Sequence, residues 1–276
     1  MNNPYLTALC QMSVADDKEK NLRHAAELID EAVRVGARVI CLPEIWNSPY
    51  DIKLFGARAE PDGGPSTALM SGLAGIHGIY LIGGSIPESA DGRIYNTSYV
   101  FGPSGEMIAK HRKAHLFDVD IERGVRFKES EVFSPGEGIT VFDTEFGRMG
   151  LAVCFDLRFP GMFKEMAGAG AHIVFLPASF NMTTGPAHWD TLIKARALDN
   201  QIYLAACSPA RDLSASYTSW GHSCVATPWG EFCAAADSRE SIAYATIDIG
   251  YLQKIRQELP VGNQPATDRP AAGAEN

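Results

Sequence analysis

The chain has 276 residues, of which 46% are apolar and 21% are charged, a composition typical of globular proteins. Its 33 acidic and 24 basic residues give a formal net charge of -9, and this charge disfavours nucleic acids and anionic membrane surfaces as partners. No apolar run approaches the roughly 18 residues that span a bilayer, and no basic region precedes the short apolar stretch at the N-terminus, so the sequence predicts neither a membrane helix nor a secretory signal.

The six cysteines do not form a disulfide or zinc-ribbon pattern. None belongs to a C-x-x-C pair, and most lie within or beside apolar runs, where a free thiol behaves as a small hydrophobic residue. Disulfides are uncommon in a chain of this length without a signal peptide. We therefore expect reduced cysteines and a cytoplasmic protein.

The first third of the chain alternates strands with helices. The hydrophobic pattern predicts strands at 5–12, 37–42 and 79–84 and helices at 18–35 and 66–77. Asp16 and Glu19 have the spacing of a capping box before the first helix, and Gly36 is placed to end it. Residues 95–111 instead predict a hairpin that turns at 102–105.

The second half resembles the first in its order of elements. The pattern predicts strands at 139–143, 149–154, 172–176, 202–208 and 241–248, helices at 160–169 and 185–200, and a hairpin at 221–235. Two β-rich layers with helices outside them fit this order. No linker divides the chain, so we expect one domain over residues 1–260. The tail at 261–276 is rich in Pro, Gly and Ala and is predicted to be extended or mobile.

Three predicted strands end in a reactive or ionisable side chain: Glu44 after ARVICLP, Lys113 after EMIAKHR, and Cys154 after GLAV. In open α/β sheets the ligand crevice lies at the carboxyl ends of strands, so these three side chains are candidates for one site. Each taken alone also fits a simpler role. Glu44 fits a solvated loop and Lys113 a solvated basic face, whereas Cys154 is followed at once by the polar turn DLRFP.

Together the three side chains suit acyl transfer. A thiolate is the nucleophilic form of cysteine, and a carboxylate can act as its base if burial raises the carboxyl pKa. A lysine about 4 Å away would favour the thiolate by about 4 kcal/mol at an effective dielectric near 20. The same ammonium would stabilise a tetrahedral oxyanion, where loss of one donor costs on the order of 100- to 1000-fold in rate.

Longer motifs around these residues resemble the nitrilase superfamily of carbon–nitrogen hydrolases, and in particular its omega-amidase branch. The resemblance covers nearly the whole chain and rests on LPEIWNSPY, KHRKAHLFDVDI, RFKESEVFSPG, VCFDLRFP, FNMTTGPAHWDTLIKARALDNQIYLAACSPARD and SYTSWGHSCVATPWGEF. It implies an α/β fold, a four-layer α-β-β-α sandwich. It also implies a homodimer or a larger homo-oligomer, and a reaction that uses no metal and no organic cofactor.

The resemblance also implies roles for individual residues. Glu44 matches the general base of the family, Lys113 its catalytic lysine and Cys154 its nucleophile. Glu129 in RFKES matches a second glutamate that positions the lysine and the substrate. The backbone N–H of Phe155 would join Lys113 in holding the oxyanion.

The implied substrates are 2-oxoglutaramate and 2-oxosuccinamate, which would yield the dicarboxylic keto acid and ammonia. Because such a substrate carries a carboxylate into a negatively charged protein, the pocket must supply donors or a cation. Tyr50, His188 and Arg211 lie in the matching motifs and are the candidates, although His188 also fits a helix cap and Arg211 a structural ion pair.

Two departures from the family pattern stand out. Gly161 follows RFP where many relatives have glutamate, and the tail after Pro260 lacks the basic and aromatic ending common in this branch. Three other functions stay open at this point. They are an amidase of the same superfamily acting on deaminated glutathione or an N-carbamoyl compound, an inactive binding scaffold, and a thiol redox sensor with Cys207 as the nearest later cysteine.

Overall fold

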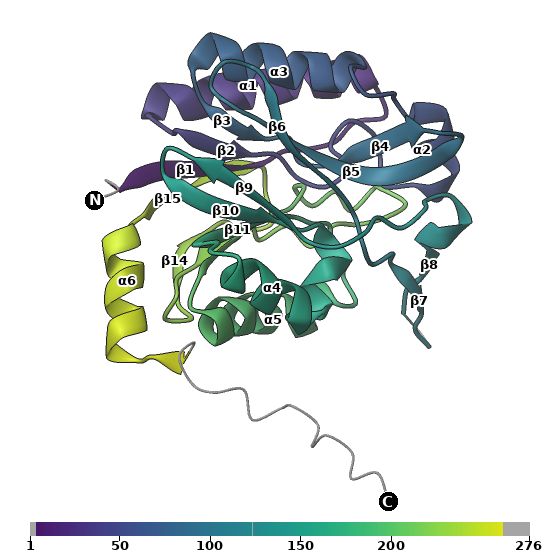
Figure 1. The fold of residues 1–276 in the computed structure, drawn as a ribbon. Coiled ribbons are helices and arrows are strands. Elements are labelled where there is room, and N and C mark those ends of the chain that lie inside the picture. The colour runs from purple at the N-terminus through teal and green to yellow at the C-terminus, as the bar shows by residue number, and fades with distance from the viewer. Residues whose placement is uncertain (1–3, 123, 262–276) are drawn as a thin grey trace, which may run out of the picture.

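Two mixed β-sheets pack face to face, and helices cover the outer face of each sheet (Figure 1). The computed structural model describes residues 4–122 and 124–261. The first sheet has the strand order β15 (Ser241–Ile247), β1 (Tyr5–Gln11), β2 (Val39–Cys41), β3 (Tyr80–Ile82), β5 (Arg93–Phe101), β4 (Ile86–Ala90), with β6 (Met107–Arg112) also paired to β5. The second has the order β14 (Phe232–Ala235), β13 (Cys224–Ala226), β12 (Tyr203–Cys207), β11 (Ile173–Pro177), β10 (Gly147–Leu151), β9 (Thr140–Thr144).

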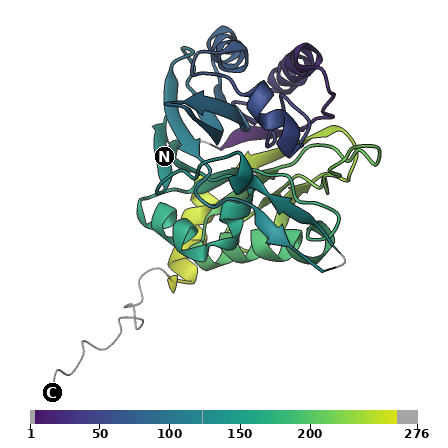
Figure 2. The same cartoon turned by 90° about the vertical axis from the view of Figure 1, so that its right-hand side faces the viewer.

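The helices divide between the two outer layers, as the view turned by 90° also shows (Figure 2). The first sheet is covered by α1 (Lys18–Val35) and α3 (Pro65–His77), and the second by α4 (Pro160–Gly168) and α5 (Gly185–Asn200). Shorter elements complete the described chain: α2 (Ile52–Arg58), α6 (Ile249–Glu258), the 3-10 turns η1 (Glu129–Glu131) and η2 (Cys154–Arg158), and the two-stranded β7 (Asp118–Asp120) and β8 (Arg126–Lys128).

Three apolar cores separate the four layers, and side-chain alternation along the strands assigns residues to them. In β2, Val39 and Cys41 face the core between the sheets, whereas Ile40 faces the core under α1 and α3. In β11, Phe175 faces the inner core and Val174 the core under α4 and α5. Successive side chains of a strand point to opposite faces, so a continuous apolar run fills two cores at once. The predicted α-β-β-α sandwich is confirmed.

Each sheet has a parallel centre flanked by antiparallel strands. β1, β2 and β3 run parallel in the first sheet, and β10, β11 and β12 run parallel in the second. Parallel strands end at one edge of their sheet, and the segments that follow β2 and β10 carry Glu44 and Cys154. The topology thus brings two of the three predicted site segments to neighbouring sheet edges.

The structure confirms several predicted boundaries and corrects two details. The helices at 18–35 and 185–200 and the hairpin turn at 102–105 are present, and Gly36 ends α1 with a left-handed φ of 99°. The predicted capping box is wrong, because Asp17 caps α1 by accepting from the Lys20 N–H. The predicted strand at 149–154 ends at Leu151, and Cys154 begins a 3-10 turn instead.

No helix in the described part of the chain is both long and apolar enough to cross a membrane. The tail predicted at 261–276 lies outside the described residues except for Val261. The single domain over residues 1–260 stays a prediction.

Candidate active site

A lysine lies between two carboxylates in the interior of the protein. The Nζ of Lys113 is 2.9 Å from Oε1 of Glu44 and 2.9 Å from Oε2 of Glu129, and all three side chains are 0% exposed. Tyr50 donates its hydroxyl to Glu129 at 2.6 Å, and Asn96 donates its amide to Glu44 at 2.8 Å. We call Glu44, Lys113 and Glu129 the carboxylate–lysine cluster. The structure excludes the solvated roles that Glu44 and Lys113 also fitted.

Burial and the opposite charges set the protonation of this cluster. Burial alone would lower the pKa of Lys113, but the charges of Glu129 and Glu44 outweigh it and raise the pKa well above its ordinary value. Burial also raises the pKa of Glu44, and Lys113 opposes that rise. Oε2 of Glu44 has no hydrogen-bond partner of ordinary geometry among the described residues, although the Cys154 thiol lowers the pKa of this carboxyl as a weak donor. Lys113 therefore stays protonated, and Glu44 has a free oxygen suited to accept a proton.

The turn that carries Glu44 is held in an unusual backbone conformation. Ile45 has a φ of 50°, a value that is rare for a β-branched residue and persists only where the surroundings enforce it. Its N–H donates to the Ser85 hydroxyl at 3.1 Å, and the Ser85 N–H donates to the Pro43 carbonyl at 3.1 Å. Gly84 lies against this turn with a φ of 60°, and a Cβ at that position would stand 2.1 Å from the Pro43 oxygen.

We expect Gly84→Ala to destabilise the protein by at least about 2 kcal/mol, because the added methyl combines backbone strain with overlap. Since the displaced turn carries Glu44, turnover per folded molecule is expected to fall as well, by about tenfold or more. Urea unfolding and steady-state assays measure the two effects. Gly161→Ala is the matched control: nothing lies within 4 Å of its Cβ position in α4, so stability should be unchanged or rise by up to about 1 kcal/mol. Equal behaviour of the two variants would contradict this account.

Cys154 also lies on a strained turn. It has a φ of 46° and opens η2, with its side chain buried at 4% exposure. Burial raises the pKa of its thiol well above the ordinary value, and Glu44 adds to the rise, while Lys113 and the Ser179 backbone N–H oppose it. Desolvation thus outweighs the effect of the Lys113 ammonium, which by itself would favour the thiolate. The resting group is a thiol, and attack on a carbonyl requires a base.

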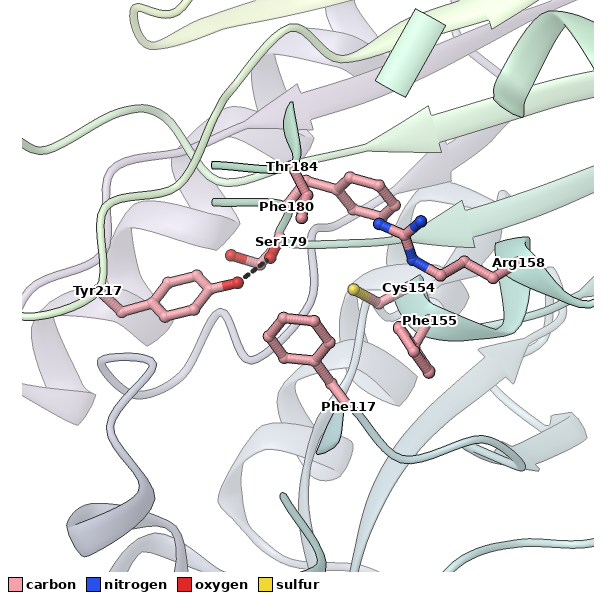
Figure 3. A pocket seen from close by; sticks show the side chains of 8 residues that line it. All are labelled: Phe117, Cys154, Phe155, Arg158, Ser179, Phe180, Thr184 and Tyr217. Carbon is pink, nitrogen blue, oxygen red and sulfur yellow. Dashed lines mark hydrogen bonds between the residues drawn. The ribbon is translucent and has the colours of Figure 1, made fainter. Parts of the chain in front are cut away.

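A small cavity opens against the sulfur of Cys154 (Figure 3). Its walls are mostly aromatic, with Phe117, Phe155, Phe180 and Tyr217 among the lining residues. The Tyr217 hydroxyl is fixed by a 2.6 Å hydrogen bond to the Ser179 carbonyl. Such a cavity suits a small acyl group with few polar atoms.

Arg158 supplies the positive charge of this cavity, and it was not among the predicted site residues. It follows Cys154 by one turn of η2, lies in the lining and faces the rings of Phe155 and Phe180 at 5.5 Å and 5.2 Å. Burial lowers the pKa of its guanidinium, and the Cys154 charge opposes that shift. The sequence signal was available in CFDLR, where an arginine follows the cysteine by four residues within the same polar turn.

A second and larger cavity lies beyond Tyr217, which lines both spaces. Its lining includes Glu44 and Tyr50, and Asp16 and Asp212 also belong to it. Glu44 of the carboxylate–lysine cluster thus borders the larger cavity, whereas Cys154 lines the smaller one.

The structure brings one of the three predicted substrate-binding residues to the cluster. Tyr50 hydrogen-bonds Glu129 and stacks on Tyr217 at 4.5 Å. His188 is exposed and outside the cavity lining, with its Nδ1 3.2 Å from Arg158. The guanidinium of Arg211 donates to the Trp220 carbonyl at 2.8 Å and stacks on that ring. Its role in substrate binding stays a prediction.

The cysteines of the described chain are all free, Cys154 among them. Cys207 packs in the core between the sheets with its sulfur 3.3 Å from the Cys41 carbonyl, whereas Cys154 belongs to the core under α4 and α5. Cys207, the resolving cysteine of the redox-sensor hypothesis, therefore lies in a different core from Cys154. Among the described residues, no three His, Cys, Asp or Glu side chains are grouped to hold a metal ion.

Comparison with known proteins identifies relatives over almost the whole chain. The family model described as carbon–nitrogen hydrolase matches residues 6–257. The chain is 49% identical over 261 residues to omega-amidase NIT2-A of Xenopus laevis, a match that covers 95% of each protein. It is 47% identical to omega-amidase NIT2 of Homo sapiens, again over 95% of each.

Solved structures agree with the sequence comparison. Nit3 of Saccharomyces cerevisiae, described as a member of branch 10 of the nitrilase superfamily, superimposes with a TM-score of 0.88 at 39% identity, over 95% of this chain and 96% of that one. The chain, which buries a thiol, two carboxylates and a lysine in its interior, belongs to the carbon–nitrogen hydrolase family of the nitrilase superfamily, whose members hydrolyse amide carbon–nitrogen bonds.

Proposed function

We propose that this protein is an omega-amidase, which hydrolyses the terminal amide of 2-oxoglutaramate and 2-oxosuccinamate to the dicarboxylic keto acid and ammonia. The observation that carries the proposal is Arg158, a cation that lines the same small, largely aromatic cavity as the Cys154 thiol. A short substrate that carries both an amide and a carboxylate would present the amide to the thiol and the carboxylate to the guanidinium. The names of the relatives from Xenopus laevis and Homo sapiens support the same substrate class.

Acylation begins with proton transfer from the Cys154 thiol to Glu44. The sulfur then attacks the amide carbon, and the carbonyl oxygen becomes an oxyanion held by Lys113 and the Phe155 backbone N–H. Phe155 is the second residue of η2, where an N–H has no acceptor within its own turn. Glu44 returns the proton to the departing nitrogen, the carbon–nitrogen bond breaks, and ammonia and a thioester are formed.

Deacylation repeats the same proton transfers with water. Glu44 takes a proton from a water molecule, whose oxygen attacks the thioester carbon, and Lys113 again stabilises the oxyanion. Collapse breaks the carbon–sulfur bond, Glu44 returns the proton to the sulfur, and the free acid leaves. Glu129 and Tyr50 hold Lys113 in place during both steps, as their hydrogen bonds indicate.

An ammonia-release assay across a panel of amides tests the substrate proposal. The panel contains 2-oxoglutaramate, 2-oxosuccinamate, deaminated glutathione and an N-carbamoyl amino acid. We expect the highest kcat/KM for the two keto-acid amides, and hydroxylamine should divert their thioesters to hydroxamates. Preference for deaminated glutathione or the carbamoyl compound would assign the protein to another amidase of the family, and no turnover of any amide would favour the binding scaffold.

We expect Arg158→Gln to reduce kcat/KM for 2-oxoglutaramate by about 10- to 100-fold, since a hydrogen bond to a charged group contributes about 1.5–3 kcal/mol. The neutral amide butyramide, which lacks the carboxylate, is the matched substrate and should lose no more than about threefold. His188→Gln is the control variant, because His188 contacts Arg158 but does not line the cavity. A similar loss on both substrates would mean that Arg158 supports the cavity wall and does not bind the carboxylate.

Three further predictions accompany this proposal. The family resemblance favours a homodimer or a larger homo-oligomer, which light scattering in solution measures. Cytoplasmic location and a single domain over residues 1–260 are tested by fractionation and by limited proteolysis.

A further inference from the structure

Two histidines hydrogen-bond the buried carboxylate of Asp156, next to the active site. Oδ1 of Asp156 accepts hydrogen bonds from Nδ1 of His115 at 2.8 Å and from the His115 backbone N–H at 2.9 Å. Oδ2 lies 3.1 Å from Nε2 of His111 and accepts from the Val153 N–H at 3.0 Å. Asp156 is 0% exposed, and Nδ1 of His111 is 2.9 Å from the Thr140 hydroxyl. Each carboxylate oxygen therefore has two partners, which is ample for a buried charge.

The positions of these residues in the chain connect two parts of the active site. His111 and His115 stand two residues before and two residues after Lys113, and Asp156 stands two residues after Cys154. β6 ends at Arg112, and the hydrogen bonds of His111 and His115 to Asp156 show that both histidines, which flank Lys113, point toward the segment that carries the cysteine. The Asp156 carboxylate is thus a direct link between the lysine segment and the cysteine turn.

The same carboxylate also holds the strained turn. Its Oδ2 accepts a hydrogen bond from the N–H of Val153, and the Asp156 N–H donates to the Val153 carbonyl at 3.1 Å. Asp156 therefore makes two hydrogen bonds with the residue before Cys154. Cys154 itself has a φ of 46°. A non-glycine residue keeps such a conformation only when its surroundings over-determine it, at a cost of order 1–3 kcal/mol.

We propose that His111, Asp156 and His115 form a clamp whose function is to position the Cys154 sulfur relative to the Lys113 ammonium. The clamp does not touch the substrate, so its members are positioning residues. The inference rests on the proposed roles of Cys154 and Lys113 in catalysis. Since misplacement of a reacting group by about 1 Å costs on the order of 100-fold, the clamp acts on the chemical step and leaves substrate binding nearly unchanged.

Substitutions at His115 separate the effect of its hydrogen bond to Asp156 from the effect of losing its ring. The amide nitrogen of asparagine can occupy the place of Nδ1 in histidine, whereas glutamine extends beyond it. Both variants lose the ring that stacks on Phe159 at 3.5 Å, so they are matched in that loss. The side chain is 33% exposed, and either substitution is compatible with folding. We expect His115→Asn to retain kcat within about threefold and His115→Gln to lose about tenfold or more.

Asp156→Asn is the stronger variant. It keeps the shape of the side chain but replaces one acceptor by a donor, so kcat should fall by about 100-fold with KM within threefold. Glu60→Gln is the control, because Glu60 is also a buried carboxylate with several donors, namely Lys18, Asn47 and Ser66. That variant should lower the melting temperature and leave kcat per folded molecule unchanged.

Alkylation of Cys154 by iodoacetamide gives a readout that needs no amide substrate. Mass spectrometry of the Cys154 peptide separates it from the exposed Cys233. We expect Asp156→Asn and His115→Gln to change the rate and the pH profile of this alkylation, and Glu60→Gln and His115→Asn to leave both unchanged. A wrong substrate assignment would abolish amide turnover in every variant but not the difference in alkylation.

Two results would overturn the clamp. One is that Asp156→Asn and His115→Gln lower the melting temperature while kcat and the alkylation profile of the folded protein stay those of the parent. The other is that His115→Asn and His115→Gln behave alike in both measurements, which would assign the effect to the lost ring. If Asp156→Asn does not fold, the comparison of His115→Asn with His115→Gln tests the clamp by itself.

Discussion

Cys154→Ala is expected to reduce ammonia release by on the order of 10⁶-fold, to the background rate of the assay buffer. The reason is that no other group of the cavity can form the thioester, since the remaining lining side chains are aromatic, hydroxyl or guanidinium groups. Hydroxamate formation should disappear together with ammonia release. The fold should persist, because removal of one sulfur atom leaves the core under α4 and α5 otherwise intact. Ammonia release, hydroxamate formation and the melting temperature measure these effects.

Cys233→Ala is the matched control for this experiment. Cys233 is the one exposed thiol among the free cysteines of the described chain, and it lies in β14 at the edge of the second sheet. Its removal should change neither turnover nor hydroxamate yield. Retention of more than about 1% of the parent activity by Cys154→Ala would contradict a thioester mechanism at this residue.

Lys113→Met is expected to abolish activity and to destabilise the protein at neutral pH. The variant leaves Glu44 and Glu129 buried side by side without their cation, and removal of one partner of a buried ion pair typically costs about 3–5 kcal/mol. Activity should fall by about 100- to 1000-fold or more, because the oxyanion loses its charged donor. Urea unfolding and ammonia release measure the two losses.

The loss of stability in Lys113→Met should depend on pH in a defined direction. Lys113 lowers the pKa of Glu44, so without it the pKa of this buried carboxyl rises further above the unfolded value. A raised carboxyl pKa contributes stability that is present below the unfolded pKa and is lost as pH rises through the folded pKa. The variant should therefore be closer to the parent in stability near pH 5 than near pH 8.

A second substitution completes this test. Lys113→Met combined with Glu129→Gln removes one of the two unpaired charges, so part of the lost stability should return while activity stays absent. Lys254→Met is the matched control, since Lys254 forms only an exposed pair with Glu258 at 3.8 Å in α6. A Lys113→Met variant as stable as the parent at every pH would mean that the cluster does not carry the charges assigned to it.

Local signals predicted most of the secondary structure. The helix at 18–35 agrees with α1 because an acidic cap and Gly36 mark its two ends, and the helix at 185–200 agrees with α5. The strand predicted at 149–154 extends beyond the observed end of β10 at Leu151, and the difference has a physical reason. Ala152 and Val153 are as apolar as the strand, but their partners are Phe175 and Asp156, and no sequence pattern contains those contacts.

The residues of the candidate site also differ in how far the sequence predicted them. Polar groups at strand ends pointed to Glu44, Lys113 and Cys154 without any relative, whereas Glu129 was found only through the family resemblance. Arg158 was missed, although its spacing from Cys154 was visible in the sequence. Arg211 contacts Trp220 in the structure, and its predicted role in substrate binding stays untested, because a motif shows which residues recur and not where a long side chain points.

The amino-acid sequence by itself predicted the alternation of strands and helices and singled out Glu44, Lys113 and Cys154, and its family resemblance implied the four-layer fold and the roles of these residues, because periodicity, caps and motifs are local. Only the tertiary structure decided that the lysine is shared by two buried carboxylates, that the resting cysteine is a thiol and that Asp156 links its turn to the histidines beside Lys113. Desolvation and charge act through space between segments more than 40 residues apart in the chain, such as His111 and Asp156, and no local pattern records those distances.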